Sequence, residues 1–237
     1  MNVAHDFFDR CAFVSVDFQA GGPDPGGPRR HVTEETMPRA WRERGKTPAD
    51  VNAAADYAVD VALPNACRVA DACRRLGLPM IFVHWGFRFR DGMDLDPEIY
   101  RLLRSEHGDD PAAWPHHISD PGSAPAGQFH VRGGEYVIAK TGQDAFSSSS
   151  LGFVLHNLGA KRMVSVGGHT GACHGRTVRS ARERGYAVLV VEDATCDAFA
   201  STRLTHIEEF GYDHLVTTEE FLALAARGNR AGGRSCL

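Results

Sequence analysis

The sequence lacks the features that mark several classes of protein. No apolar run approaches the roughly 20 residues that a membrane-spanning helix needs. Positive charge is not in excess, because 26 Lys and Arg stand against 30 Asp and Glu and the net charge is −4. The first ten residues do not have the basic-then-apolar order of a signal peptide. These absences predict a cytoplasmic protein that binds neither nucleic acid nor membrane.

Cysteine is present, but without the spacing of a disulfide framework or a zinc site. The chain contains 6 cysteines, and no two of them form a C-x-x-C pair. Most lie within segments that we expect to be helices or strands. We therefore expect reduced thiols at all of these positions (Cys11, Cys67, Cys73, Cys173, Cys196 and Cys236).

The chain has a regular alternation of apolar strand-like runs and helical segments. Its 237 residues, 43% of them hydrophobic, suit one large domain. We expect strands at 11–16, 80–84, 136–139, 162–166, 187–191 and 214–217. We expect helices ending at 76, then near 98–104, and at 148–158, 173–184, 201–210 and 218–226. This order predicts the α/β class, as a three-layer α-β-α domain over 1–227 around a mostly parallel sheet of about six strands.

Three details of this layout carry their own predictions. Pro64 lies within an apolar helical stripe, so we expect the helix to kink or restart there. The connection from Gly86 to Gly134 is long for a compact domain, which is typical of functional lids and partner contacts. The segment 228–237 is expected to be a flexible C-terminal tail.

Polar residues end three of the expected strands or follow them. Asp17 follows the first strand, Lys140 follows the strand at 136–139, and Cys173 lies between a Gly-Gly turn and a helix. The carboxyl ends of parallel strands form one edge of a sheet, where α/β proteins bind ligands. A helix start favours a thiolate, so we expect the pKa of Cys173 to fall. A small buried core cysteine is the structural alternative at this position.

These three motifs resemble the isochorismatase-like cysteine hydrolases. The matching segments are Val-Asp-Phe-Gln ending at Gln19, Lys-Thr-Gly-Gln-Asp-Ala-Phe-Ser beginning at Lys140, and Gly-Gly-His-Thr-Gly-Ala before Cys173. The resemblance runs from about Phe13 to Leu224 and keeps the family order Asp, Lys, Cys. It implies the isochorismatase-like hydrolase fold. Nicotinamidases, N-carbamoylsarcosine amidohydrolases, ureidoacrylate amidohydrolases and biuret hydrolases belong to this group.

The resemblance also implies roles for individual residues. Cys173 is the nucleophile, Asp17 accepts the thiol proton and later protonates the leaving amine, and Lys140 stabilises the anions. The backbone N–H groups of His169 and Cys173 form the oxyanion hole, next to a non-proline cis bond between Gly168 and His169. The implied reaction hydrolyses the C–N bond of a small amide, ureido or lactam substrate through a thioester. It needs no cofactor.

Other side chains near the expected strand ends are candidates for contact with the substrate. For each, packing within the protein is the alternative interpretation. The segment from His84 to Asp91 offers one histidine where nicotinamidases place an Asp and two His, so we expect no metal. His116 and His117 are expected to be solvated in a loop. The candidate substrate-binding residues are Gln19, His84, Trp85, Phe146 and His169.

Two residues depart from the family pattern. Relatives usually have a small or apolar residue where this chain has His169, and an acidic residue or Asn where it has Gly171. These departures affect the expected substrate and leave the expected chemistry unchanged. An imidazole at 169 is expected to contact the substrate or to tune the nearby protonation equilibria.

The resemblance leaves other functions open. Vinyl-ether hydrolysis of the isochorismatase type is one, although that branch generally lacks the cysteine. A nicotinamidase with an eroded metal site is another, and a catalytically silent binding scaffold is a third. Relatives are commonly oligomers, so we expect a homodimer or homotetramer.

Overall fold

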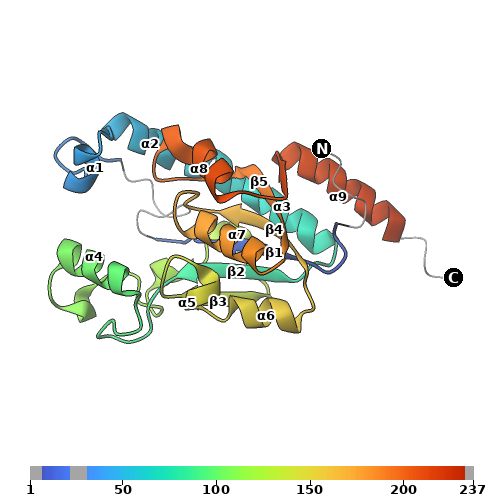
Figure 1. The fold of residues 1–237 in the computed structure, drawn as a ribbon, viewed down its shortest axis with the longest axis horizontal. Coiled ribbons are helices and arrows are strands. Elements are labelled where there is room, and N and C mark those ends of the chain that lie inside the picture. Colours follow the sequence, from blue (N-terminus) through green and yellow to red (C-terminus); the bar gives the residue numbers. More distant parts are fainter. Residues whose placement is uncertain (1–6, 22–30, 233–237) are drawn as a thin grey trace.

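A parallel sheet of six strands forms the middle layer of the molecule (Figure 1). The computed structural model describes residues 7–21 and 31–232. The strand order is β3-β2-β1-β4-β5-β6, and every neighbouring pair is parallel. The predicted α/β class and three-layer sheet are confirmed. The strands are β1 Cys11–Val16, β2 Met80–Trp85, β3 Tyr136–Lys140, β4 Arg162–Gly167, β5 Ala187–Thr195 and β6 His214–Val216.

Helices cover both faces of the sheet and bury its alternating side chains. Phe13 and Phe82 point to one face, where Ala66 and Phe221 meet them from helices. The other face has its own apolar cluster, which includes Leu155. The first face carries α2 Pro48–Tyr57, a π-helical segment Ala58–Ala62, α3 Leu63–Arg75 and α9 Thr218–Gly232. The second carries α5 Ala145–Ser148, α6 Leu151–Asn157, α7 Cys173–Glu183 and α8 Arg203–Phe210.

Several elements differ from the sequence expectations. The restart expected at Pro64 is present, because the π-helical segment ends there and Pro64 lies in the first turn of α3, where no N–H is missed. Strand β5 continues to Thr195, four residues beyond the expected end. The helix expected over 148–158 is α6, which begins only at Leu151, and the short helix α5 precedes it. Helix α9 runs past its expected end at 226 to Gly232, and positions 233–237 of the expected tail lie outside the described residues.

The long connection between β2 and β3 is a packed structure of its own. It contains α4 Pro97–His107, which stands apart from the sheet in Figure 1, and three short 3-10 turns. Five of its side chains form a separate apolar cluster (Phe87, Leu95, Ile99, Leu103 and Trp114). The part from Phe87 to Trp114 is therefore held by its own small core and projects from the carboxyl edge of the sheet, whereas Phe129 packs in the core beneath the sheet.

No helix in the described part of the chain is long and apolar enough to cross a membrane.

Candidate active site

Asp17, Lys140 and Cys173 meet at the carboxyl edge of the sheet. Asp17 follows β1 and has a left-handed backbone (φ 55°), Lys140 is the last residue of β3, and Cys173 is the first residue of α7. The loop from β4 to Cys173 passes very close to β1. A Cβ atom at Gly167 would lie 2.1 Å from the carbonyl oxygen of Val16, and φ is +129° at Gly167. Only glycine fits there, and it lets the ends of β1 and β4 approach each other.

Lys140 connects the other two residues. Its Nζ lies 2.8 Å from Asp17 Oδ2 and donates to Cys173 Sγ at 3.2 Å and to the carbonyl oxygen of Gly142 at 3.1 Å. The ammonium group thus has three acceptors, and the Lys140 side chain is fully buried (0% exposed). The other carboxylate oxygen, Asp17 Oδ1, is buried and has no hydrogen-bond partner within the described structure.

The charges of the three groups depend on one another. Burial works to lower the pKa of Lys140, but Asp17 and Cys173 beside it outweigh that effect and raise the pKa. Burial raises the pKa of the Cys173 thiol to about 12; Lys140 opposes this and the Asp17 carboxylate adds to it. At neutral pH the site therefore holds an ammonium group and a neutral thiol.

The prediction that the pKa of Cys173 falls was wrong. It considered the helix start, whose dipole favours a thiolate. It did not consider burial, which removes the sulfur from water and favours the uncharged form. A thiolate forms here only when a neighbouring group takes the proton.

The peptide bond between Gly168 and His169 is cis, at the position that the family resemblance implies. The carbonyl oxygen of His169 accepts from the N–H groups of Ala172 and His174. The Thr170 N–H donates to the carbonyl oxygen of Cys196 at 2.9 Å, and the Gly171 N–H donates to Asp197 at 3.4 Å. Within the described residues, the backbone N–H groups of His169 and Cys173 donate to no protein acceptor. Both remain available to a bound oxygen atom.

The two residues that end β2 lie beside these groups. His84 is buried, and its Nδ1 has no partner within the described structure. Burial lowers the pKa of His84, while the charge of Asp17 works to raise it. Trp85 is paired in register with Lys140 on the neighbouring strand. Both candidate residues are thus close to Lys140 and Asp17.

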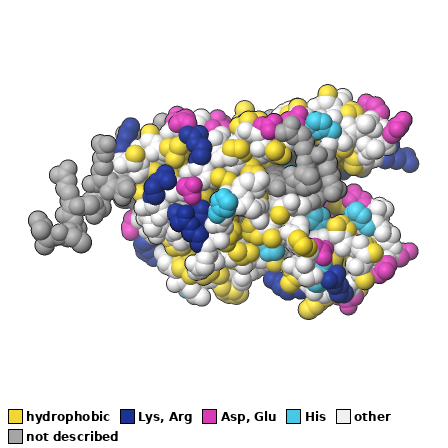
Figure 2. All heavy atoms as spheres, turned by 180° about the vertical axis from the view of Figure 1, so that it is seen from behind, with side chains coloured by type: hydrophobic (Ala, Val, Ile, Leu, Met, Phe, Trp, Pro, Cys, Tyr) yellow, Lys and Arg dark blue, Asp and Glu magenta, His cyan; other side chains and the backbone are white. Residues whose placement is uncertain are grey.

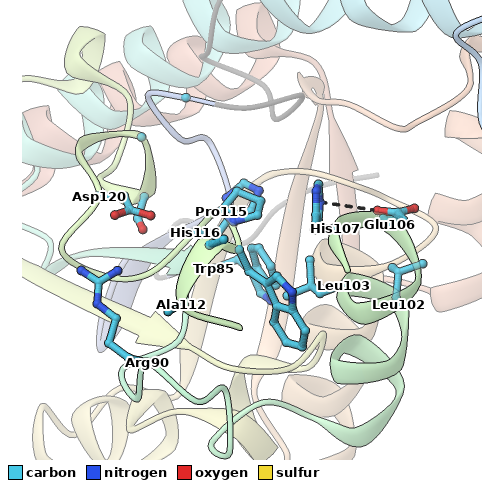
Figure 3. Close-up of a pocket in the computed structure, with 15 residues that line it drawn as sticks. Trp85, Arg90, Leu102, Leu103, Glu106, His107, Ala112, Pro115, His116 and Asp120 are labelled. Carbon is cyan, nitrogen blue, oxygen red and sulfur yellow. Dashed lines mark ion pairs between the residues drawn. The ribbon is translucent and has the colours of Figure 1, made fainter. Parts of the chain in front are cut away.

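A cavity of about 830 Å³ opens next to Trp85 (Figure 3). The ring of Trp85 meets the ring of His116 edge to face, with centroids 4.4 Å apart. Burial lowers the pKa of His116 to about 4, so its imidazole is neutral at pH 7. Arg90 and Asp120 lie on one side of the cavity, and Leu102 and Leu103 lie on the other side with Glu106 and His107 (Figure 3). Seen from behind, the molecule is hollowed on the right between two lobes, with histidine side chains around the hollow (Figure 2).

His116 and His117 are not solvated as expected. His116 packs on Trp85. His117 is buried, with Nδ1 2.7 Å from the Ser119 hydroxyl and Nε2 2.8 Å from the carbonyl oxygen of Arg88. The connection folds back on the end of β2 and covers both rings.

Gln19 supports the cavity wall through backbone hydrogen bonds. Its amide nitrogen donates to the carbonyl oxygens of Trp85 (2.9 Å) and Ser123 (3.2 Å), and its amide oxygen accepts from the Trp85 N–H (3.0 Å). Both N–H groups of the amide are used, and the side chain is fully buried. Gln19, two residues after Asp17, therefore links the backbone at Trp85 to the backbone at Ser123.

Phe146 does not line the cavity beside Trp85. Asp144 caps α5 through the N–H groups of Phe146 and Ser147, and this sets the direction of the helix. The Phe146 ring packs on Tyr186 with centroids 5.7 Å apart, and the Arg184 guanidinium lies over it at 5.0 Å. The ring therefore packs on neighbouring side chains, and it lines a separate hollow of about 570 Å³.

Sequence reasoning missed two residues near the loop. Asp197 follows the end of β5 by two positions and is buried, with His206 Nδ1 2.5 Å from its Oδ2. Asp17 was a candidate because it follows the end of a strand. Asp197 would have met the same criterion if β5 had been expected to reach Thr195. The half-buried His169 faces the same carboxylate, whose charge opposes the burial that lowers the pKa of His169.

The described residues contain no group of three His, Cys, Asp or Glu side chains arranged to hold a metal ion.

A family model described as the isochorismatase domain matches residues 49–220, a range that includes Lys140 and Cys173 and begins after Asp17. The chain belongs to the isochorismatase family. A cysteine hydrolase from Pseudomonas syringae pv. phaseolicola 1448A has a TM-score of 0.66 at 16% identity, over 92% of this chain and 93% of that one. An isochorismatase family protein from Desulfovibrio vulgaris subsp. vulgaris str. Hildenborough has a TM-score of 0.63 at 20% identity (92% and 98% covered).

The N-carbamoylsarcosine amidase of Thermoplasma acidophilum is also similar, with a TM-score of 0.57 and 23% identity over 88% of this chain and 96% of that one. At these identities the structures support the fold. Together with the family model they show the isochorismatase-family fold, and the family is one of hydrolases.

His174, next to the candidate nucleophile, is expected to make the protein less stable in acid. The ring is buried, Nε2 pairs with the Ser165 hydroxyl at 2.9 Å, and burial lowers its pKa to about 4. An unfolded histidine titrates near 6.5. Below that pH the unfolded state therefore takes up a proton that the folded state does not, and stability falls toward pH 4.

This effect on the free energy of unfolding is expected to be about 2 kcal/mol at pH 5 relative to pH 7.5. Urea unfolding at the two pH values measures it. His174→Gln, which does not titrate, should show a loss smaller by that amount, because His116 and the other titrating groups act equally in both proteins. Equal losses in both proteins would rule out this role for His174.

Proposed function

We propose that the protein is a metal-independent cysteine amidohydrolase that cleaves the C–N bond of a small amide, ureido or lactam substrate. The contact that carries this proposal is the buried ammonium group of Lys140, 2.8 Å from a carboxylate and 3.2 Å from a thiol. A buried cation stabilises any anion formed beside it. The three groups together supply a nucleophile, a base and a charge that stabilises the thiolate.

Acylation begins when the Cys173 thiol gives its proton to Asp17. The sulfur attacks the amide carbonyl carbon, and the carbonyl oxygen becomes an oxyanion. The N–H groups of His169 and Cys173 can donate to that oxygen, because neither donates to a protein acceptor within the described residues. Comparable donors contribute about 3 kcal/mol each. The C–N bond then breaks, and the leaving nitrogen takes the proton from Asp17.

In the second half of the reaction, water takes the place of the thiol as the attacking group and hydrolyses the thioester. A water molecule gives a proton to Asp17 and attacks the thioester carbon. The tetrahedral intermediate releases the acid product, and the sulfur recovers the proton from Asp17. The unpartnered Oδ1 of Asp17 supports this step, because it is buried beside the thiol and free to accept the proton.

The cavity beside Trp85 is the proposed place for the rest of the substrate. Its wall is braced by Gln19, two residues from Asp17, and Trp85 is in register with Lys140. Its volume lies within the range of small-molecule sites. His84, with its unpartnered Nδ1, and His169 do not line this cavity; they are the proposed polar contacts for the part of the substrate that lies between the cavity and Cys173.

Ammonia release from a panel of acetamide, benzamide, N-carbamoylglycine and 2-pyrrolidinone, with product analysis for the lactam, tests this function. Turnover of at least one compound by the wild type, undiminished after dialysis against EDTA, is the expected result. Activity that disappears with EDTA and returns with zinc, iron or manganese would contradict the metal-independent reaction. Turnover of none, with unreactive Cys173, would favour the binding scaffold.

We also propose a cytoplasmic homodimer or homotetramer. The connection between β2 and β3 exposes several large apolar side chains that a second copy would cover (Phe89, Met93, Leu102 and Ile118).

A further inference from the structure

The carboxylate of Asp197 lies behind the loop that joins β4 to Cys173. Its Oδ1 accepts from the N–H of Ala198 at 2.8 Å and from the N–H of Gly171 at 3.4 Å. Its Oδ2 accepts from the Thr202 hydroxyl at 3.0 Å and from His206 Nδ1 at 2.5 Å. Asp197 therefore joins the β5–α8 segment to the loop, two residues before the thiol.

The ring of His206 fills the space over Gly171. A Cβ atom at residue 171 would lie 2.4 Å from His206 Nδ1 and 2.5 Å from its Cε1. The backbone of Gly171 is not in the left-handed region, so the reason for glycine here is space alone. The lack of a side chain at Gly171 therefore makes room for the ring of His206. The hydrogen bond from His206 to Asp197 holds that ring in place.

The charge of Asp197 is maintained by its neighbours. Burial works to raise its pKa, but the two imidazoles of His169 and His206 and the N–H of Ala198 outweigh burial and lower the pKa. The carboxylate is not among the groups that shift the pKa of Cys173. Its contacts near the site are the hydrogen bonds to the Gly171 N–H and to His206, so we expect its influence to be exerted through the position of the loop.

We propose that Asp197 and His206 are positioning residues that hold the loop, so that the N–H groups of His169 and Cys173 point at one carbonyl oxygen. The role rests on the proposed function, because those N–H groups matter only when a carbonyl is attacked. Without the Asp197–His206 bond, the carboxylate that accepts from the Gly171 N–H loses one of its anchors, and the ring over Gly171 is free to move. The two donors then lose their common target.

Four readouts together separate this role from support of the fold. Thermal unfolding reports stability. Alkylation of Cys173 by iodoacetamide, followed by mass spectrometry, reports the reactivity of the sulfur in a reaction in which no carbonyl group is attacked. Inhibition by propionaldehyde or benzaldehyde reports carbonyl attack, because the thiohemiacetal places its oxygen against the two N–H donors. Turnover of the amide that the panel identifies completes the set.

His206→Ala and Asp197→Asn are expected to lower kcat about tenfold with KM changed less than twofold. The inhibition constants of the aldehydes should rise about tenfold, while the alkylation rate stays within twofold of wild type. His206→Asn, whose amide nitrogen can still donate to Asp197, should recover most of the activity. Thr205→Ala, at an exposed neighbouring residue of α8, is the matched control and should change none of these values.

Gly171→Ala provides a second test from the opposite side of the contact. The added methyl group must displace His206, so we expect the same tenfold losses. In the His206→Ala background the methyl group has room, and Gly171→Ala should then cost less than twofold. Additive losses in the double variant would contradict the proposed packing of His206 on Gly171.

The positioning role is overturned if His206→Ala and Asp197→Asn keep wild-type kcat and aldehyde inhibition, or if the losses simply follow a lower melting temperature. The proposed function would stand in that case, provided that Cys173→Ala is inactive. If the wild type neither turns over an amide nor binds an aldehyde, although Cys173 is alkylated, the proposed function fails and the positioning role fails with it.

Discussion

Cys173→Ala is expected to abolish amide turnover, by at least about a thousandfold, with the fold unchanged. The sulfur is the atom that would bond to the substrate, and alanine offers no replacement. The cavity left by removing one sulfur atom is small, and Cys173 is only partly buried among its apolar neighbours. Cys173→Ser keeps a hydroxyl group but should be nearly as inactive, because the serine proton is far more difficult to remove.

The matched control for this substitution is Cys67→Ala. Cys67 is also partly buried, and burial raises the pKa of its thiol to about 11. Ammonia release by the two variants, normalised to folded protein by circular dichroism, measures the effect. If Cys173→Ala keeps more than about a tenth of the wild-type rate, Cys173 is not the nucleophile. If Cys67→Ala loses activity as well, the assay reports stability and not chemistry.

Asp17→Asn should lower kcat by about a hundredfold to ten-thousandfold, because the amide cannot take the thiol proton. The same change should also destabilise the protein. Lys140 is fully buried, and removing its charged partner leaves an ammonium group without a counterion. Breaking a buried ion pair from one side costs about 3–5 kcal/mol. Lys140→Met should destabilise in the same way, by leaving Asp17 without its cation.

The double variant Asp17→Asn and Lys140→Met separates the two effects. With both charges removed, most of the lost free energy of unfolding should return, since no unpaired charge is buried. Activity should not return, because the base and the cation are both missing. Urea unfolding and ammonia release measured on the same preparations test this. Recovery of turnover in the double variant would show that neither group takes part in the reaction.

The sequence allowed the fold and the meeting of three residues to be predicted, because both follow from local pattern and topology. Six apolar runs separated by helices leave few arrangements other than a parallel sheet. In such a sheet Asp17, Lys140 and Cys173 must lie on one edge. Each residue could be located without knowing any side-chain direction.

The features that escaped prediction depend on packing between distant segments. The pKa of Cys173 is set by burial, which no local pattern reports. The direction of Phe146 follows from the Asp144 cap and from Tyr186, 40 residues later in the chain. Asp197 and His206 were missed because β5 is longer than its apolar run suggests.

The separate core of the β2–β3 connection divides the molecule into two parts with different freedom to vary. The side chains that stabilise the part from Phe87 to Trp114 pack mainly on one another (Phe87, Leu95, Ile99, Leu103 and Trp114), whereas Ala126 and Phe129 of the same connection belong to the core of the sheet, which fixes Asp17, Lys140 and Cys173. Replacement of the part from Phe87 to Trp114 by one of different length or composition is expected to reshape the cavity and to leave the thiol, the carboxylate and the ammonium group in place. Grafting between relatives is therefore a practical route to new substrate preferences. The same division explains how one reaction centre can diversify while its sheet stays constant.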